Sequence, residues 1–186
     1  MSDPEGGAIL TLEPLVEAVR EGVEPSGWRL SGLQKTTSYE FEGRWEGDST
    51  RSAYLFFHPS PGPDWATLDV FLDETPRGLS GNLALVVDAR SLAELGDIAG
   101  SLRALAEVAR GCLPQRYRAP LTLRLHLETL DADPGSAQAE IRFKLRIPRS
   151  CIASGAPDVS TMAATAATAL RALLEDSRLA PFIDVK

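Results

Sequence analysis

The sequence predicts a single α+β domain, in which a mainly antiparallel sheet of about six strands is combined with N-terminal, central and C-terminal helices. Apolar and polar residues alternate in short segments, and apolar residues recur at helical spacing in longer ones. The predicted order is one helix, four strands, a central helix, two strands and a last helix. No linker long enough to separate two domains interrupts the 186 residues, so we expect one domain over residues 1–186.

The N-terminal part is predicted to form a helix followed by a hairpin. Apolar residues recur at helical spacing over residues 8–23, and Gly22 and Pro25 are expected to end this helix. Two strands follow at about 35–45 and at 52–58, joined by a turn that contains glycine. They would form the first hairpin of the sheet.

The strand at 52–58 differs from the others because residues 53–57 make both of its faces apolar. Strands with two apolar faces lie inside a sheet that is covered on both sides. We therefore expect this strand to be central, with cover over each face. Two further strands are predicted at 67–72 and 83–87, each preceded by a loop that contains proline and glycine.

The central helix is predicted over residues 91–113, where a following proline ends it. Gly96 and Gly100 lie one turn apart in it, and each costs about 1 kcal/mol relative to alanine. Glycine kept at that cost usually allows another backbone to approach closely. The last helix, from Asp158 to about Asp176, is rich in alanine, and we hypothesise that its alanine surface packs against the two glycines.

Residues 120–148 form the clearest pattern in the chain, an amphipathic β-hairpin whose water-facing side is basic. Apolar and polar residues alternate on both sides of a turn at 131–136. Glu128 and Glu140 are the acids on the polar face, and two positive charges are left over even if both acids are paired. The candidate partner-binding residues are the basic ones on that face: Arg124, Arg142, Lys144 and Arg146.

The positive excess of this hairpin has three interpretations. It could dock an acidic helix or segment of a partner protein. It could receive the acidic N-terminal region of the chain itself, or it could simply be a solvated face.

Aromatic residues give a second interaction signal, because nine of the twelve lie between Trp28 and Phe71. They either fill the core or form a groove or dimer interface. A groove suggests an alternative function, a small-ligand-binding or hydrolytic domain whose curved sheet wraps the C-terminal helix and leaves an apolar pocket. The residues expected to line that pocket are Tyr39, Tyr54, Trp65 and His58.

The sequence contains no motif of a known catalytic, phosphate-binding or metal-binding type. The two histidines, His58 and His126, are too few for a multi-histidine metal centre. Cys112 falls on the apolar stripe of the central helix and is expected to be an inert core thiol, and Cys151 has no histidine near it in sequence. We therefore expect no enzymatic activity, no catalytic residue, no metal and no cofactor.

Charge and composition also indicate which partners and which location to expect. The net charge of −7 argues against nucleic-acid binding, and no window is apolar and long enough for a membrane span. Two cysteines without metal-ligand spacing, and a first segment that lacks the order of a signal peptide, predict a cytoplasmic location. The excess of arginine over lysine, together with many alanines, suggests a bacterial coding sequence rich in G and C.

The order of the elements, together with the small size and acidity, resembles that of class I type III secretion chaperones and of the related YbjN-like domains. This chain has one more strand before its central helix. The resemblance implies an α+β protein that dimerises and binds segments of other proteins without catalysis. We therefore expect a non-enzymatic protein-binding module, namely a chaperone, adaptor or immunity-type partner, that uses a sheet surface and forms a homodimer.

Overall fold

The computed structural model describes residues 10–39, 49–117 and 120–183, and it confirms the predicted α+β class. Six antiparallel strands form one open sheet in the order β1-β2-β3-β4-β6-β5. The strands are β1 (Trp28–Tyr39), β2 (Ser49–Pro59), β3 (Ala66–Thr75), β4 (Gly78–Ala89), β5 (Leu121–His126) and β6 (Gln138–Arg146). The basic hairpin is β5–β6, and it joins the rest of the sheet through the pairing of β6 with β4.

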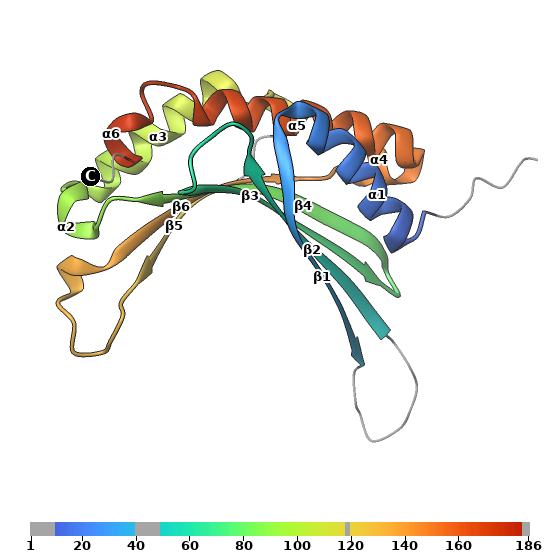
Figure 1. Cartoon of the computed structure of the whole chain (residues 1–186), viewed down its shortest axis with the longest axis horizontal. Coiled ribbons are helices and arrows are strands. Elements are labelled where there is room, and N and C mark those ends of the chain that lie inside the picture. Colours follow the sequence, from blue (N-terminus) through green and yellow to red (C-terminus); the bar gives the residue numbers. More distant parts are fainter. Residues whose placement is uncertain (1–9, 40–48, 118–119, 184–186) are drawn as a thin grey trace, which may run out of the picture.

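The long helices lie together on one side of this sheet (Figure 1). The helices are α1 (Leu12–Val23), α2 (Leu92–Leu95), α3 (Ile98–Cys112), α4 (Arg149–Ser154), α5 (Ala156–Leu174) and α6 (Ala180–Ile183). In Figure 1 the sheet arches, α1, α3 and α5 cover its outer, convex side, and the inner, concave side carries no described helix. The sheet therefore curves away from the C-terminal helix and does not wrap it, contrary to the arrangement expected for a ligand pocket.

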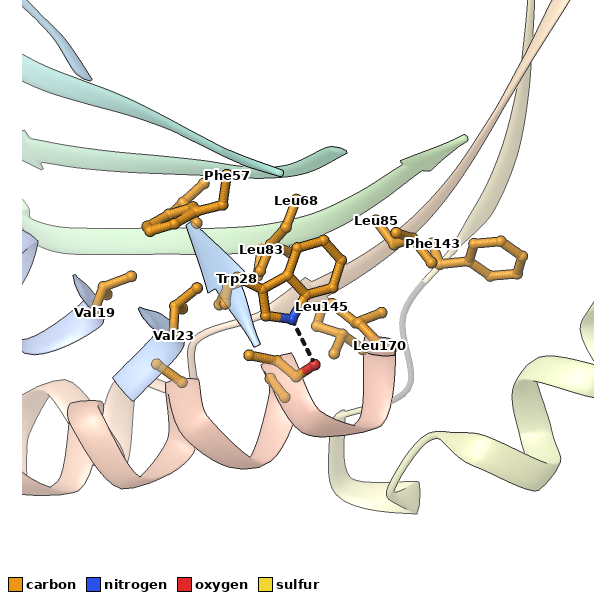
Figure 2. Packing of buried hydrophobic residues seen from close by; sticks show 14 of the residues in the cluster. Val19, Val23, Trp28, Phe57, Leu68, Leu83, Leu85, Phe143, Leu145 and Leu170 are labelled. Carbon is orange, nitrogen blue, oxygen red and sulfur yellow. Dashed lines mark hydrogen bonds between the residues drawn. The ribbon is translucent and has the colours of Figure 1, made fainter. Parts of the chain in front are cut away.

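The main core lies between the sheet and the layer formed by α1 and α5. Figure 2 shows Val19 and Val23 of α1 pointing into this layer together with Phe57 of β2. Trp28, at the start of β1, is only 2% exposed, and its indole Nε1 donates a hydrogen bond to the carbonyl oxygen of Ala167 on α5 (3.1 Å). This bond satisfies the one polar atom of the buried ring and joins the first strand to the last long helix.

The expectations about glycine are wrong in two places. The helix predicted over 91–113 is broken at Gly96, whose φ of 60° interrupts it, so that α2 and α3 are separate. A Cβ added at Gly96 would have no described atom within 4 Å, and one added at Gly100 would meet the Asp97 side chain rather than α5. The alanine-rich helix is approached instead by Gly22, which lies one residue before the end of α1, and this helix ends at Val23 as predicted.

The strand that was expected to be covered on both faces, β2, is covered on one face only. It does lie inside the sheet, between β1 and β3. Ala53, Leu55 and Phe57 are fully buried against the helices, whereas Tyr54 and Phe56 are each 37% exposed on the opposite face. The apolar run at 53–57 therefore combines one core face with one aromatic surface, and the prediction of a second covering layer is wrong for the described residues.

Candidate functional site

The concave side of the sheet is a surface to which each strand contributes alternate side chains. Because the helix-facing residues of the central strands are buried, the residues between them point away from the helices. No described helix covers these side chains (Figure 1). We call this surface the open face, and the members used below are Tyr54, Phe56, His58, Asp69, Phe71, Asn82, Ala84, Val86, Arg124, Glu140, Arg142, Lys144 and Arg146.

An aromatic cluster occupies the part of the open face formed by β2 and β3. Tyr54 is paired with Phe71 across these strands, and the ring centroids are 4.9 Å apart at an interplanar angle of 44°. Phe56 is the next open-face residue along β2 and lies opposite Asp69. The rings of Tyr54 and Phe56 remain more than one third exposed, so this cluster presents apolar area to a partner.

A small ion-pair network lies at the centre of the open face. The Arg142 Nε donates a hydrogen bond to Oε1 of Glu140 (2.5 Å), and its Nη2 lies 3.8 Å from Oδ2 of Asp69. Burial raises the pKa of the Asp69 carboxyl, although a hydrogen bond from the Thr67 hydroxyl (2.9 Å) and the charge of Arg142 act in the opposite direction. Arg142 is therefore occupied by two carboxylates and adds little free positive charge to the surface.

The arginine can reach across β4 because the strand carries small side chains on this face. Ala84 and Val86 are the β4 residues paired with Asp69 and Arg142 respectively, and both are buried. A larger side chain at either position would separate the two charged groups. These two residues thus form the floor of the open face between the aromatic and the basic parts.

The remaining basic residues carry the positive excess. Within the described part of the chain, Arg124, Lys144 and Arg146 have no carboxylate within 4 Å of their charged nitrogens, and all three are exposed. Arg124 is paired in register with Glu140, but that carboxylate binds Arg142 of its own strand. The free charges are therefore those of Arg124, Lys144 and Arg146.

The pairing of β4 with β6 brings the aromatic and basic signals onto one continuous surface. One row across the sheet runs from Tyr54 through Phe71 and Asn82 to Arg146. The neighbouring row begins at Phe56 and ends at Lys144. Sequence reasoning treated these signals as separate. It counted Phe71 only among the clustered aromatics, and it did not place Asp69 or Asn82 beside the basic hairpin. Alternation assigns each residue to a face of its own strand. The β6 residues that pair with β4 lie 50 to 64 positions later in the chain and cannot be found in this way.

The four residues predicted to line a ligand pocket are not gathered in one place. Tyr54 and His58 both belong to the open face of β2, and the Nδ1 atom of His58 is buried without a described hydrogen-bond partner. Trp65 packs against the main core. The side chain of Tyr39 lies outside the described residues.

A cavity of about 250 Å³ is found on the helix side of the sheet, between α3 and the β5–β6 hairpin. The residues that line it are mainly apolar: Ala106, Ala109, Leu113, Leu121 and Phe143, together with Arg110 and Lys144. The cavity lies across the sheet from the open face. It shows that the helices pack less completely over β5 than over the central strands.

The other candidate groups stay apart from the open-face network. Cys112 is half-buried, its Sγ lies 3.7 Å from Oδ2 of Asp176, and burial raises the pKa of the thiol. Cys151 is also half-buried, and His126 lies exposed at the end of β5. Among the described residues, no group of three or more histidines, cysteines or carboxylates could hold a metal ion, and none of the described helices is both long and apolar enough to cross a membrane.

The described part of the acidic N-terminal region does not neutralise the open face. α1 lies on the helix side of the sheet (Figure 1), whereas Lys144 and Arg146 alternate with the buried residues of β6 and belong to the open face. Its Glu13 forms an ion pair with Arg51 at 2.8 Å. The candidate site is thus a concave, aromatic and basic sheet surface without a covering element in the described chain.

Comparisons with models of protein families, with curated proteins and with solved structures found no match for this chain.

Proposed function

We propose that this protein is a non-enzymatic binding module, such as a chaperone or adaptor, that holds an acidic and partly apolar segment of another protein on its open face. The observation that carries this proposal is that partly exposed aromatic rings and free cations lie on the same uncovered sheet surface. Tyr54 and Phe56 would supply apolar contact area. Lys144 and Arg146, on β6 and separated from these rings by β3 and β4, would supply complementary charge.

The charge distribution of the chain supports an acidic partner segment. The whole protein carries a formal charge of −7, so an acidic segment is repelled by most of its surface. The basic strand of the open face is an exception, because the acids beside it are already paired with Arg142. Attraction at this strand and repulsion elsewhere would orient the segment, and the aromatic cluster would then hold its apolar residues.

Charge reversal of Lys144 and Arg146 to glutamate is expected to weaken the binding of acidic peptides about tenfold, which corresponds to about 1.4 kcal/mol. Both side chains are exposed, so the double variant should keep the stability of the parent. The measurement is fluorescence anisotropy with peptides selected from an array that varies net charge and apolar content. The affinity of the parent should also fall as salt is raised, because exposed charges are screened.

The matched control reverses Arg103 and Arg149 to glutamate. These residues are exposed on α3 and α4, in the helix layer, and the control has the same net charge as the test variant. It should bind peptides almost as well as the parent. Equal losses in the two variants, or an array without preference for acidic peptides, would contradict the proposed function.

A further inference from the structure

The end of β5 and the segment that follows it expose three leucines that no described element covers. Leu125 is 49% exposed, Leu127 is 37% exposed and Leu130 is fully exposed, and these are three of the six large apolar residues found exposed in the described chain. Leu121 and Leu123, earlier in the strand, still pack against the core. The helix layer therefore ends over the middle of β5, and the exposed leucines lie near the end of this strand and beyond it.

The backbone of this strand is also free for pairing. The Lys144 backbone N–H on β6 donates to the carbonyl oxygen of Pro120 (3.4 Å). Backbone groups alternate in direction along an antiparallel strand, so those of Leu121, Leu123 and Leu125 point away from β6. They form an open edge at which a further strand can add.

The opposite edge of the sheet, β1, is protected in a way that β5 is not. The register of β1 with β2 shifts between Leu30 and Gly32, which is a bulge, and Lys35 is exposed on the same strand. Bulges and lysines are common means of preventing edge-to-edge association. The pairing of β5 with β6 runs without a shift from Leu121 to His126.

The residues of the β5 edge are complementary to themselves. If two copies pair antiparallel about a two-fold axis at His126, Arg124 lies opposite Glu128 of the second copy, and Leu125 lies opposite its Leu127. Each of these contacts then occurs twice. An axis at Leu125 would place Arg124 opposite His126, and an axis at Arg124 would place two arginines together. Among these three registers, only the one at His126 joins opposite charges, and it requires each strand to extend to Glu128.

We propose that two copies of this chain associate through β5 about an axis at His126, so that their sheets join into one continuous sheet. The exposed leucines of both copies would then cover one another on the helix side. Arg124 would pair with Glu128 of the second copy on the side of the open face. The two open faces would become continuous, whereas Lys144 and Arg146 would stay accessible on each copy.

Two single charge reversals and their combination test this interface. The parent should sediment with about twice the chain mass of 20.0 kDa when its concentration is raised. Arg124→Glu and Glu128→Arg should each raise the dimer dissociation constant about tenfold, because two like-charge contacts replace two ion pairs. The double variant R124E/E128R restores both pairs and should return the dissociation constant to near the parent value.

Several outcomes would overturn the proposal. A parent that stays monomeric up to millimolar concentration, or single variants that dimerise as well as the parent, would exclude the β5 interface. If the single variants dimerise more weakly and the double variant does not regain the parent dissociation constant, the register about His126 is excluded. Glu128 is exposed beyond the end of β5, so Glu128→Arg tests the interface without disturbing the fold. The Lys144/Arg146 variant should dimerise normally, so a failure of peptide binding is separate from a failure of dimerisation.

Discussion

Replacement of Phe57 by alanine is expected to lower the free energy of unfolding by about 3–5 kcal/mol. Phe57 is completely buried and is paired with Leu30 on β1 and Leu68 on β3. Its ring points into the layer between the sheet and the helices (Figure 2). Alanine would leave a cavity that the surrounding strands and helices cannot fill, so the cost exceeds the loss of apolar burial alone. Urea unfolding followed by circular dichroism gives the change directly.

The adjacent residue supplies a matched control, because Phe56 is the same residue type on the same strand. Its ring is 37% exposed on the open face, so Phe56→Ala should change the free energy of unfolding by only about 1 kcal/mol or less. The same variant should weaken peptide binding, because it removes part of the aromatic cluster. Comparable destabilisation by the two variants would show that β2 is covered on both faces, and would remove the open face as a binding surface.

Phe56 and Phe57 also show where sequence reasoning reached its limit. The run at 53–57 correctly predicted a strand. Its two apolar faces were wrongly taken to indicate two covering layers. Aromatic side chains on a binding surface and aromatic side chains in a core give the same pattern, and only the position of the helices separates them. The second strand of the basic hairpin was predicted more accurately, because strict alternation distinguishes its buried Ile141, Phe143 and Leu145 from the charged residues between them.

Long-range pairing explains most of what could not be predicted at the site. Arg142 and Asp69 are far apart in sequence. They approach each other across β4 because this strand carries Ala84 and Val86 between them on the open face. Nothing local marks Asp69 as the partner of that arginine. The sequence prediction therefore included Arg142 among the residues that carry the free positive charge. In the structure, the free positive charge lies on the neighbouring basic residues instead. Strand order decides the electrostatics of this surface, and strand order is a non-local property.

Replacement of Gly22 by alanine is the second large expected effect, a loss of about 1–3 kcal/mol in the free energy of unfolding. A Cβ on Gly22 would lie 2.3 Å from the carbonyl oxygen of Ser160 and 2.9 Å from the backbone nitrogen of Ala164, both on α5. These are backbone atoms of a packed helix, so they cannot rotate away as a side chain could. α1 and α5 must separate to admit the methyl group, and the layer that covers the core would loosen.

Helix propensity alone predicts that Gly22→Ala raises the free energy of unfolding. The substitution therefore distinguishes helix propensity from close helix packing. Alanine in place of glycine inside an exposed part of a helix stabilises it by up to about 1 kcal/mol. Gly111, near the end of α3, provides that control, because the nearest atom to an added Cβ is the flexible Arg178 side chain at 3.4 Å. Gly111→Ala should therefore be neutral or stabilising in the urea measurement that shows Gly22→Ala to be destabilising. If both variants gain stability, α1 and α5 do not approach as closely as the structure shows, and the small residues of α5 would then need another explanation than close helix packing.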